Sequence, residues 1–267
     1  MNILVCIKQV PDTTEIKIDP VKHTLIREGV PSIVNPFDAC ALEMAVRLKE
    51  KEGGKVMVVS MGPAQAKNAL KECLSVGADQ AFLVTDRAFG GSDTLATSYI
   101  LSRAVRAVEQ KTGESVDVIF CGKQAIDGDT GQTAPSIAEH LGMIRLTYIV
   151  SMEIQGDKVI AKRQVEEGVE VIEAKLPVLC TATKETNKPR YATIRGKLES
   201  LKAEIPELTL EDMKDIIDTA KIGLKGSPTK VKATFTPKRT ADGVYIAGGP
   251  QSMAASLLDC LEESKVL

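Results

Sequence analysis

Four short runs of apolar residues recur through the first half of the chain, separated by more polar segments. They are residues 2–8 (NILVCIK), 55–61 (KVMVVSM), 81–85 (AFLVT) and 116–121 (VDVIFC), all containing β-branched residues. Near-continuous apolar runs of this length are typical of strands covered on both faces of a parallel sheet. The pattern therefore predicts four central, parallel strands.

The segments between these runs carry the start and stop signals of helices. Asn35 is a candidate N-cap, Pro36 occupies the first helical position, Asp38 lies in the first turn, and Gly53 and Gly54 end the pattern. Similar patterns predict further helices over residues 63–77, 93–111 and 133–141. Because strands alternate with helices, we predict an α/β fold: a three-layer, Rossmann-like wound parallel sheet.

Beyond Gly142 the pattern changes. Residues 145–183 predict a meander of strands with turns at Gly156-Asp157 and Glu167-Gly168, which would extend the sheet in antiparallel pairing at its edge. From about residue 184 the chain is more charged, with amphipathic helices expected near 209–220 and 250–263.

These changes predict two parts: an α/β domain over residues 1–186 and a C-terminal extension over residues 187–267. The extension has too little apolar pattern for a second core. The pattern favours an arm that lies on another protein, and a wrap on the chain's own domain is the alternative.

Composition excludes several classes of function. The net charge of −2, the aromatic content of 3% and the lack of Trp argue against nucleic acid as a main partner. No apolar stretch approaches the roughly 18 residues of a membrane span, and the N-terminus lacks a signal sequence, so we expect a cytoplasmic protein. The six cysteines show no metal-ligand spacing, and His23 and His140 have no companion, so we assign no metal and no catalytic residue.

The most informative segment is GKQAIDGDTGQT, residues 122–133, which follows a predicted strand and precedes a predicted helix. In a wound sheet such a loop borders the ligand crevice, and the helix offers free N–H groups to a phosphate. Thr130, Gln132 and Thr133 add side-chain donors. The chain lacks a GxGxxG fingerprint and a Walker A loop, so the segment alone fits a nucleotide site and an ordinary turn equally well.

Two acids in this loop narrow the choice. Unit charges about 4 Å apart interact by roughly 4 kcal/mol at an effective dielectric near 20. Asp127 and Asp129 therefore cannot both face a phosphate without a strong cation, and we expect them to shape the turn or to bond a ribose. Lys123 is a candidate to offset their charge.

Several segments together resemble the beta subunit of electron-transferring flavoproteins (ETF). They include ILVCIKQVPD at 3–12, VNPFDACALEMAVRLKE at 34–50, VSMGPAQA at 59–66, GKQAIDGDTGQT at 122–133 and AKRQVEEGVEVIEAKLPVLCTAT at 161–183, followed by NKPRYATI at 187–194. The resemblance implies an adenine-nucleotide α-hydrolase-like fold and a heterodimer with an alpha subunit that holds FAD. It also implies that the C-terminal arm embraces the alpha subunit, and that residues 184–194 form a partner-recognition loop.

The resemblance further implies which residues form the cofactor pocket. They are Cys6, Asn35, Pro36, Phe37, Asp38, Met61, Gly122, Lys123, Gln124, Ala125, Ile126, Asp127, Gly128, Asp129, Thr130, Gly131, Gln132 and Thr133. The pocket holds AMP in housekeeping members and a second FAD in electron-bifurcating members. Gly128 and Gly131 would let the backbone approach a pyrophosphate closely, which favours FAD.

The FAD hypothesis makes the chain part of a bifurcating or confurcating system. NAD(H) would exchange hydride with this flavin. Electrons would divide between ferredoxin or flavodoxin and, through the alpha-subunit FAD, a flavin-dependent dehydrogenase such as an acyl-CoA or lactate dehydrogenase. Two alternatives stay open: an AMP-binding beta subunit of a non-bifurcating ETF, and a stand-alone ATP-binding, stress-type protein.

Overall fold

The computed structural model of the protein describes residues 1–12, 31–232 and 243–266; His23 lies outside them. A nine-stranded sheet in the order β11-β5-β4-β1-β6-β10-β7-β8-β9 forms the centre of the described chain. The predicted parallel strands are β1 (Asn2–Cys6), β4 (Lys55–Met61), β5 (Gln80–Val84) and β6 (Val118–Gly122). They pair in parallel, which confirms the predicted fold class.

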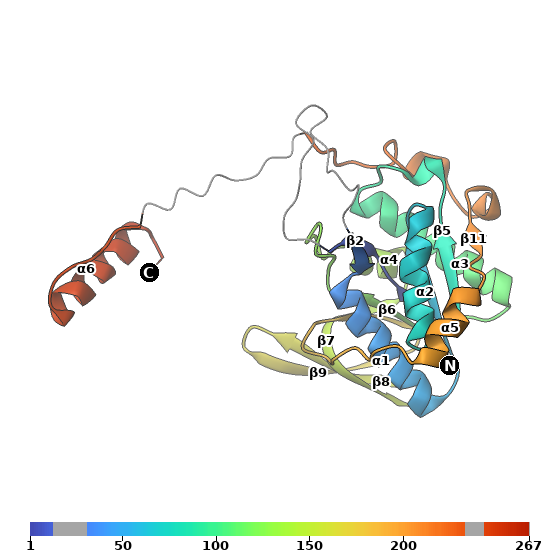
Figure 1. The fold of residues 1–267 in the computed structure, drawn as a ribbon, viewed down its shortest axis with the longest axis horizontal. Coiled ribbons are helices and arrows are strands. Elements are labelled where there is room, and N and C mark those ends of the chain that lie inside the picture. The colour runs from blue at the N-terminus through green and yellow to red at the C-terminus, as the bar shows by residue number, and fades with distance from the viewer. Residues whose placement is uncertain (13–30, 233–242, 267) are drawn as a thin grey trace.

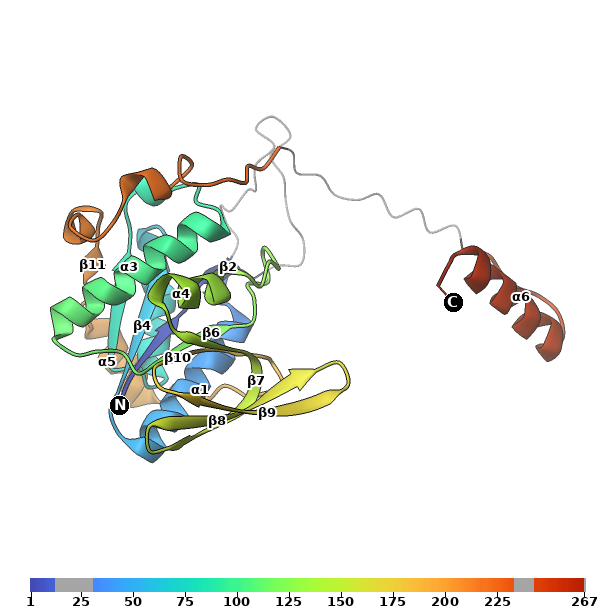
Figure 2. The same cartoon turned by 180° about the vertical axis from the view of Figure 1, so that it is seen from behind.

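Two pairs of helices cover the two faces of this sheet. Figure 1 shows α1 (Pro36–Glu52) and α2 (Lys67–Ser75) in front of it, and Figure 2 shows α3 (Thr94–Thr112) and α4 (Thr133–Leu141) from behind. Alternate strand residues serve the two cores: Ile3 of β1 packs with the α1 and α2 layer, whereas Leu4 packs with the α3 and α4 layer. All four predicted helices are confirmed, although α2 begins only after a 3-10 turn (Ala64–Ala66).

The predicted antiparallel extension is also confirmed. It consists of β7 (Ile144–Gln155), β8 (Lys158–Val165) and β9 (Gly168–Lys175). The sequence did not predict that β10 (Val178–Ala182) lies between β6 and β7 and pairs in parallel with both. A small antiparallel pair, β2 (Gln9–Pro11) and β3 (Ser32–Val34), was likewise missed.

Residues 187–229 lie on the chain's own α/β domain. An unpredicted helix, α5 (Ile194–Lys202), packs against α2, and β11 (Glu207–Leu208) joins the sheet beside β5. This part of the C-terminal extension therefore packs on the chain's own domain, which was the alternative to an arm on another protein.

The prediction of a helix near residues 209–220 is wrong. The structure has two 3-10 turns there, Glu211–Met213 and Thr219–Lys221. The Asp212 carboxylate accepts the N–H and the hydroxyl of Thr209, and the Tyr99 hydroxyl takes the N–H of Asp218, so side chains compete with a helical ladder. The apolar pattern that suggested a helix reflects burial of Met213 and Ile217.

The predicted C-terminal helix is confirmed as α6 (Pro250–Glu263). None of its residues is buried, and Figure 1 shows it standing apart from the α/β domain. Its apolar side chains, which include Met253, Leu257 and Leu258, are exposed. Among the residues that the structure describes, no helix has the length and apolar character needed to cross a membrane.

Candidate nucleotide-binding site

The loop 122–133 lies where the order of the sheet reverses. From β1 the chain passes through α1 to β4 on one side, whereas β6 pairs on the other side of β1 and leads into α4 on the opposite face. Loops that leave neighbouring strands toward opposite faces leave a crevice at the carboxyl ends of the strands. Cys6 and Met61 end β1 and β4 at this same edge, so the structure brings the predicted segments together.

The Asp38 carboxylate ties the start of α1 to the floor of the crevice. Its Oδ2 accepts the N–H of Lys8 at 2.7 Å, and its Oδ1 accepts the N–H of Gly122 at 2.9 Å. Burial raises the pKa of Asp38 to about 7, although the donors from Lys8, Asn35 and Gly122 and the charge of Lys8 oppose the shift. Asp38 thus holds β1 and β6 at fixed positions, and its own oxygens are already occupied.

Gly122 makes this close approach possible. A Cβ at this position would lie 2.4 Å from Oδ1 of Asp38 and 2.6 Å from Cβ of Phe37. Any larger residue would push α1 away from the end of β6. Gly122 is therefore needed for the packing of α1 against β6, whether or not a ligand is bound.

Asn35 fixes the next part of the loop. It occupies the predicted N-cap position of α1, but its side chain does not cap the helix. Instead its Nδ2 donates to the Gln124 carbonyl at 2.8 Å, and its Oδ1 accepts the N–H of Ile126 at 3.2 Å. Asn35 is fully buried, so its side chain ties the loop to the interior of the domain.

The two acids of the loop are paired by donors of the chain itself. Nζ of Lys8 lies 2.6 Å from Oδ1 of Asp127, and Nε2 of Gln124 donates to Oδ1 of Asp129 at 2.7 Å. Asp129 also adopts a left-handed backbone with φ 51°, and its N–H bonds the Ala125 carbonyl. These contacts agree with the expectation that the acids shape the turn.

The expected role of Lys123 is not what the structure shows. Its ammonium lies 5.1 Å from the centre of the Tyr148 ring, so Lys8 rather than Lys123 offsets the charge of Asp127. In the same way, the ammonium of Lys184 lies 4.8 Å from the centre of the Phe37 ring. The sequence indicates no partner for Lys8 and no role for Tyr148, since each contact joins residues that are remote along the chain.

The end of the loop presents donors. Gly131 has φ 63°, and α4 begins at Thr133 without a side-chain cap from Gln132. The first N–H groups of a helix have no partner within it, and the helix dipole places positive charge there. The exposed Thr130 and the half-buried Thr133 lie beside these groups. This arrangement suits an anionic group such as a phosphate.

The carboxyl ends of β1 and β6 carry a pair of thiols. Cys6 and Cys121 are register partners on β1 and β6, and both are buried. The hydrogen bond from Cys6 and burial raise the pKa of the Cys121 thiol well above its usual range, so it stays protonated. Over residues 1–12, 31–232 and 243–266, no group of three His, Cys, Asp or Glu side chains could hold a metal ion.

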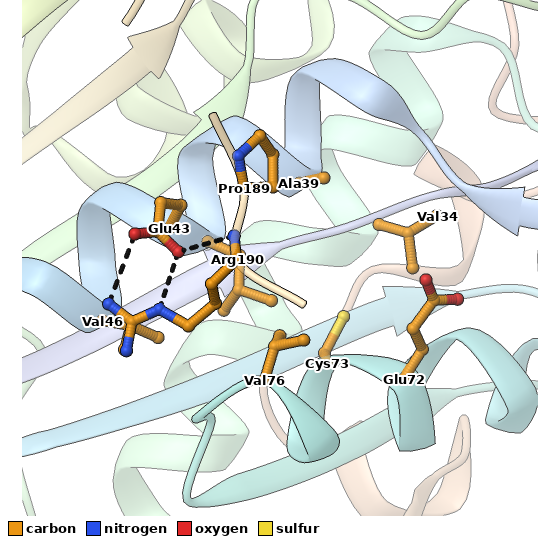
Figure 3. Close-up of a pocket in the computed structure, with 10 residues that line it drawn as sticks. Val34, Ala39, Glu43, Val46, Glu72, Cys73, Val76, Pro189 and Arg190 are labelled. Carbon is orange, nitrogen blue, oxygen red and sulfur yellow. Dashed lines mark hydrogen bonds and ion pairs between the residues drawn. The ribbon is translucent and has the colours of Figure 1, made fainter. Parts of the chain in front are cut away.

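A separate cavity of about 70 Å³ lies between α1, α2 and the segment that precedes α5 (Figure 3). Its walls are mostly apolar and include Val46, Cys73 and Pro189. At its edge the Arg190 guanidinium bonds the Glu43 carboxylate, with 2.8 Å from Nε to Oε2. This cavity belongs to the attachment of residues 187–190 and not to the crevice.

A family model for the electron transfer flavoprotein domain matches residues 22–213. The chain belongs to the electron transfer flavoprotein family. It is 52% identical over 268 residues to the electron transfer flavoprotein subunit beta of Thermoanaerobacterium thermosaccharolyticum, with all of both chains covered. The corresponding protein of Megasphaera elsdenii is 48% identical over 272 residues, again over both full chains. The caffeyl-CoA reductase-Etf complex subunit CarD of Acetobacterium woodii is 46% identical over 269 residues, with the same coverage.

Proposed function

We propose that this ETF chain binds the ADP part of FAD in the crevice at the carboxyl ends of β1 and β6. The observation that carries the proposal is the pairing of both loop acids. Because Lys8 neutralises Asp127 and Gln124 bonds Asp129, the N–H groups at the start of α4 are left as the groups that face a phosphate. A nucleotide thus fits the residues present.

Two glycines favour FAD over AMP as the occupant. A Cβ at Gly128 would meet nothing within 4 Å, and at Gly131 only the Lys123 carbonyl at 3.7 Å. No side chain therefore covers the loop backbone at Gly128 and Gly131, as close approach of a pyrophosphate requires. AMP, with a single phosphate, is the second candidate.

A bound flavin would supply the redox chemistry: hydride exchange with NAD(H), and division of electrons between ferredoxin or flavodoxin and the alpha-subunit FAD. The chain itself would bind and orient the nucleotide. The buried Cys121 thiol would stay protonated, and no side chain of the chain need act as an acid or base. A relative named for a caffeyl-CoA reductase-Etf complex supports coupling to a flavin-dependent dehydrogenase, such as an acyl-CoA or lactate dehydrogenase.

The surface outside the crevice supports two protein partners. The exposed apolar residues of α6 suit an arm that packs on an ETF alpha subunit. Exposed apolar residues also follow residues 187–190, which are bonded to α1 through Asn187 and Arg190. Tyr191 is 97% exposed and Ile194 is 85% exposed. We assign this second surface to the partner dehydrogenase, in line with the recognition loop expected at residues 184–194.

Cofactor analysis of the purified heterodimer tests the proposal. Co-production with an ETF alpha subunit, followed by quantitative chromatography of released nucleotides, should give two FAD per heterodimer. One FAD and one AMP would establish the non-bifurcating alternative. A monomer that binds ATP and no flavin would establish the stress-type alternative.

Matched glycine variants test whether the loop holds the second nucleotide. Gly131 and Gly113 both have left-handed backbones, with φ 63° and 72°, but Gly113 ends α3. Gly131→Ala and Gly113→Ala should each cost roughly 1 kcal/mol of stability. Only Gly131→Ala should lower the second nucleotide's occupancy, and equal occupancy in both variants would argue against the loop as its site.

A further inference from the structure

The sheet is irregular beside the candidate site. Between the paired positions Cys180–Leu146 and Ala182–Ile149, β10 contributes one residue, Thr181, whereas β7 contributes two, Thr147 and Tyr148. A second irregularity follows, because Ile149 pairs with Arg163 and Ser151 with Lys162. Such bulges re-aim side chains and recur next to functional sites.

Tyr148 is the residue that the first bulge re-aims. Its φ is 58°, a left-handed conformation that costs a non-glycine residue free energy. The bulge leaves the N–H of Tyr148 outside the regular ladder, and the buried Thr181 hydroxyl accepts it at 2.8 Å. The fold therefore supplies a dedicated partner for a strained tyrosine.

The ring of Tyr148 faces the first lysine of the site loop. The Lys123 ammonium lies 5.1 Å from the ring centre, within the range of a cation–π contact, and the Lys123 N–H bonds the Ala182 carbonyl at 2.8 Å. Within the described residues Lys123 forms no ion pair, whereas the charge of Lys8 is matched by Asp127. The aromatic ring thus orients a cation without neutralising it.

We propose that Tyr148 is a positioning residue of the nucleotide site: its ring holds the Lys123 ammonium at the rim of the crevice, where that charge attracts the phosphates of the bound nucleotide. The inference rests on the proposed function. It adds a residue from β7, which lies outside every segment predicted to form the pocket. It also explains why a tyrosine is kept in a strained backbone conformation at position 148.

The test uses the full-length chain, freed of nucleotide and titrated by calorimetry with AMP and with FAD. Tyr148→Phe keeps the ring and should bind within about twofold of the parent. Tyr148→Ala and Tyr148→Gly both lose the ring, and each should weaken binding roughly two- to fivefold, the range of an exposed cation–π contact. Tyr148→Gly should nevertheless melt at a higher temperature than Tyr148→Ala, because glycine accepts the left-handed backbone.

A double-variant comparison separates positioning from general packing. In a Lys123→Met background, Tyr148→Ala should have no further effect on affinity, because the ring would act only through the lysine. Parent-like affinity of Tyr148→Ala, or full additivity with Lys123→Met, would overturn the inference and leave the proposed function intact. A parent chain that binds neither AMP nor FAD would overturn both.

Discussion

Nζ of Lys8, which follows β1, lies 2.6 Å from Oδ1 of Asp127, which lies in the loop after β6. The two residues are 119 positions apart, and the side chain of Asp127 is only 18% exposed. This pair explains how a loop with two acids can border a phosphate site, since one of its charges is already matched before any ligand arrives.

Removal of the Lys8 charge should therefore weaken nucleotide binding more than it destabilises the fold. A partly exposed ion pair contributes about 1 kcal/mol or less to stability, but an unmatched Asp127 would repel a phosphate. We expect Lys8→Met to raise the Kd for AMP or FAD roughly tenfold in low salt. Addition of Asp127→Asn should restore most of the affinity, and a double variant as weak as Lys8→Met would show that Lys8 acts by another route.

Gly122 and Gly128 form a matched pair for stability. Gly122→Ala would place Cβ against Asp38 and Phe37, whereas Gly128→Ala meets open space. We expect Gly122→Ala to lose roughly 1–3 kcal/mol in urea unfolding, as is usual for overpacking, and Gly128→Ala to change stability by less than about 0.5 kcal/mol. Similar losses in both variants would mean that the contact between α1 and β6 is not tight.

Stability should fall as pH rises toward neutrality, because of Asp38. Its pKa is raised by burial to about 7, against about 3.9 for an unfolded aspartate. The folded state thus holds a proton that the unfolded state has already released between these values. The contribution is complete below about pH 4 and is lost as pH rises to about 7, with an upper limit of roughly 4 kcal/mol. Urea unfolding at pH 5, 6, 7 and 8 measures the slope, which should flatten in Asp38→Asn and would not change if another group titrates.

Two arginines near α5 should differ in importance. Arg190 bonds Glu43, whose side chain is 3% exposed, and also Glu50, whereas Arg195 pairs with Glu199 on the open surface of α5. Arg190→Met leaves a buried carboxylate short of a partner and should cost roughly 1–3 kcal/mol in urea unfolding. Arg195→Met should cost about 0.5 kcal/mol or less. Equal losses would indicate that Glu43 keeps its other donors without strain.

Local signals in the sequence were sufficient for most of the α/β domain. Pro36 at the start of α1 and Gly142 after α4 mark true helix ends, and the apolar runs mark the central strands. The helix α5 escaped prediction because Gly196 interrupts it and Leu198 faces outward. That glycine has a packing reason, since a Cβ there would lie 2.4 Å from the Ser75 carbonyl.

The position of the candidate site was predictable from the sequence, but the side-chain contacts within it were not. The loop 122–133 and the start of α1 converge as expected, because wound sheets gather loops at one edge. Asn35 and Asp38 nevertheless act on backbone groups of the crevice, and Lys8 and Tyr148 act through partners more than 20 residues away. Such pairs depend on strand register and on a bulge, which no local pattern in the sequence specifies.

The place of β10 between β6 and β7 has a consequence for synthesis of the chain. Until Val178–Ala182 leave the ribosome, the apolar strand β6 has an open edge and the β7–β8–β9 meander has no link to the rest of the sheet. About 50 residues must be synthesised after the loop 122–133 before β10 is complete and can pair with β6. During that interval the unpaired edge of β6 is open to wrong strand pairing.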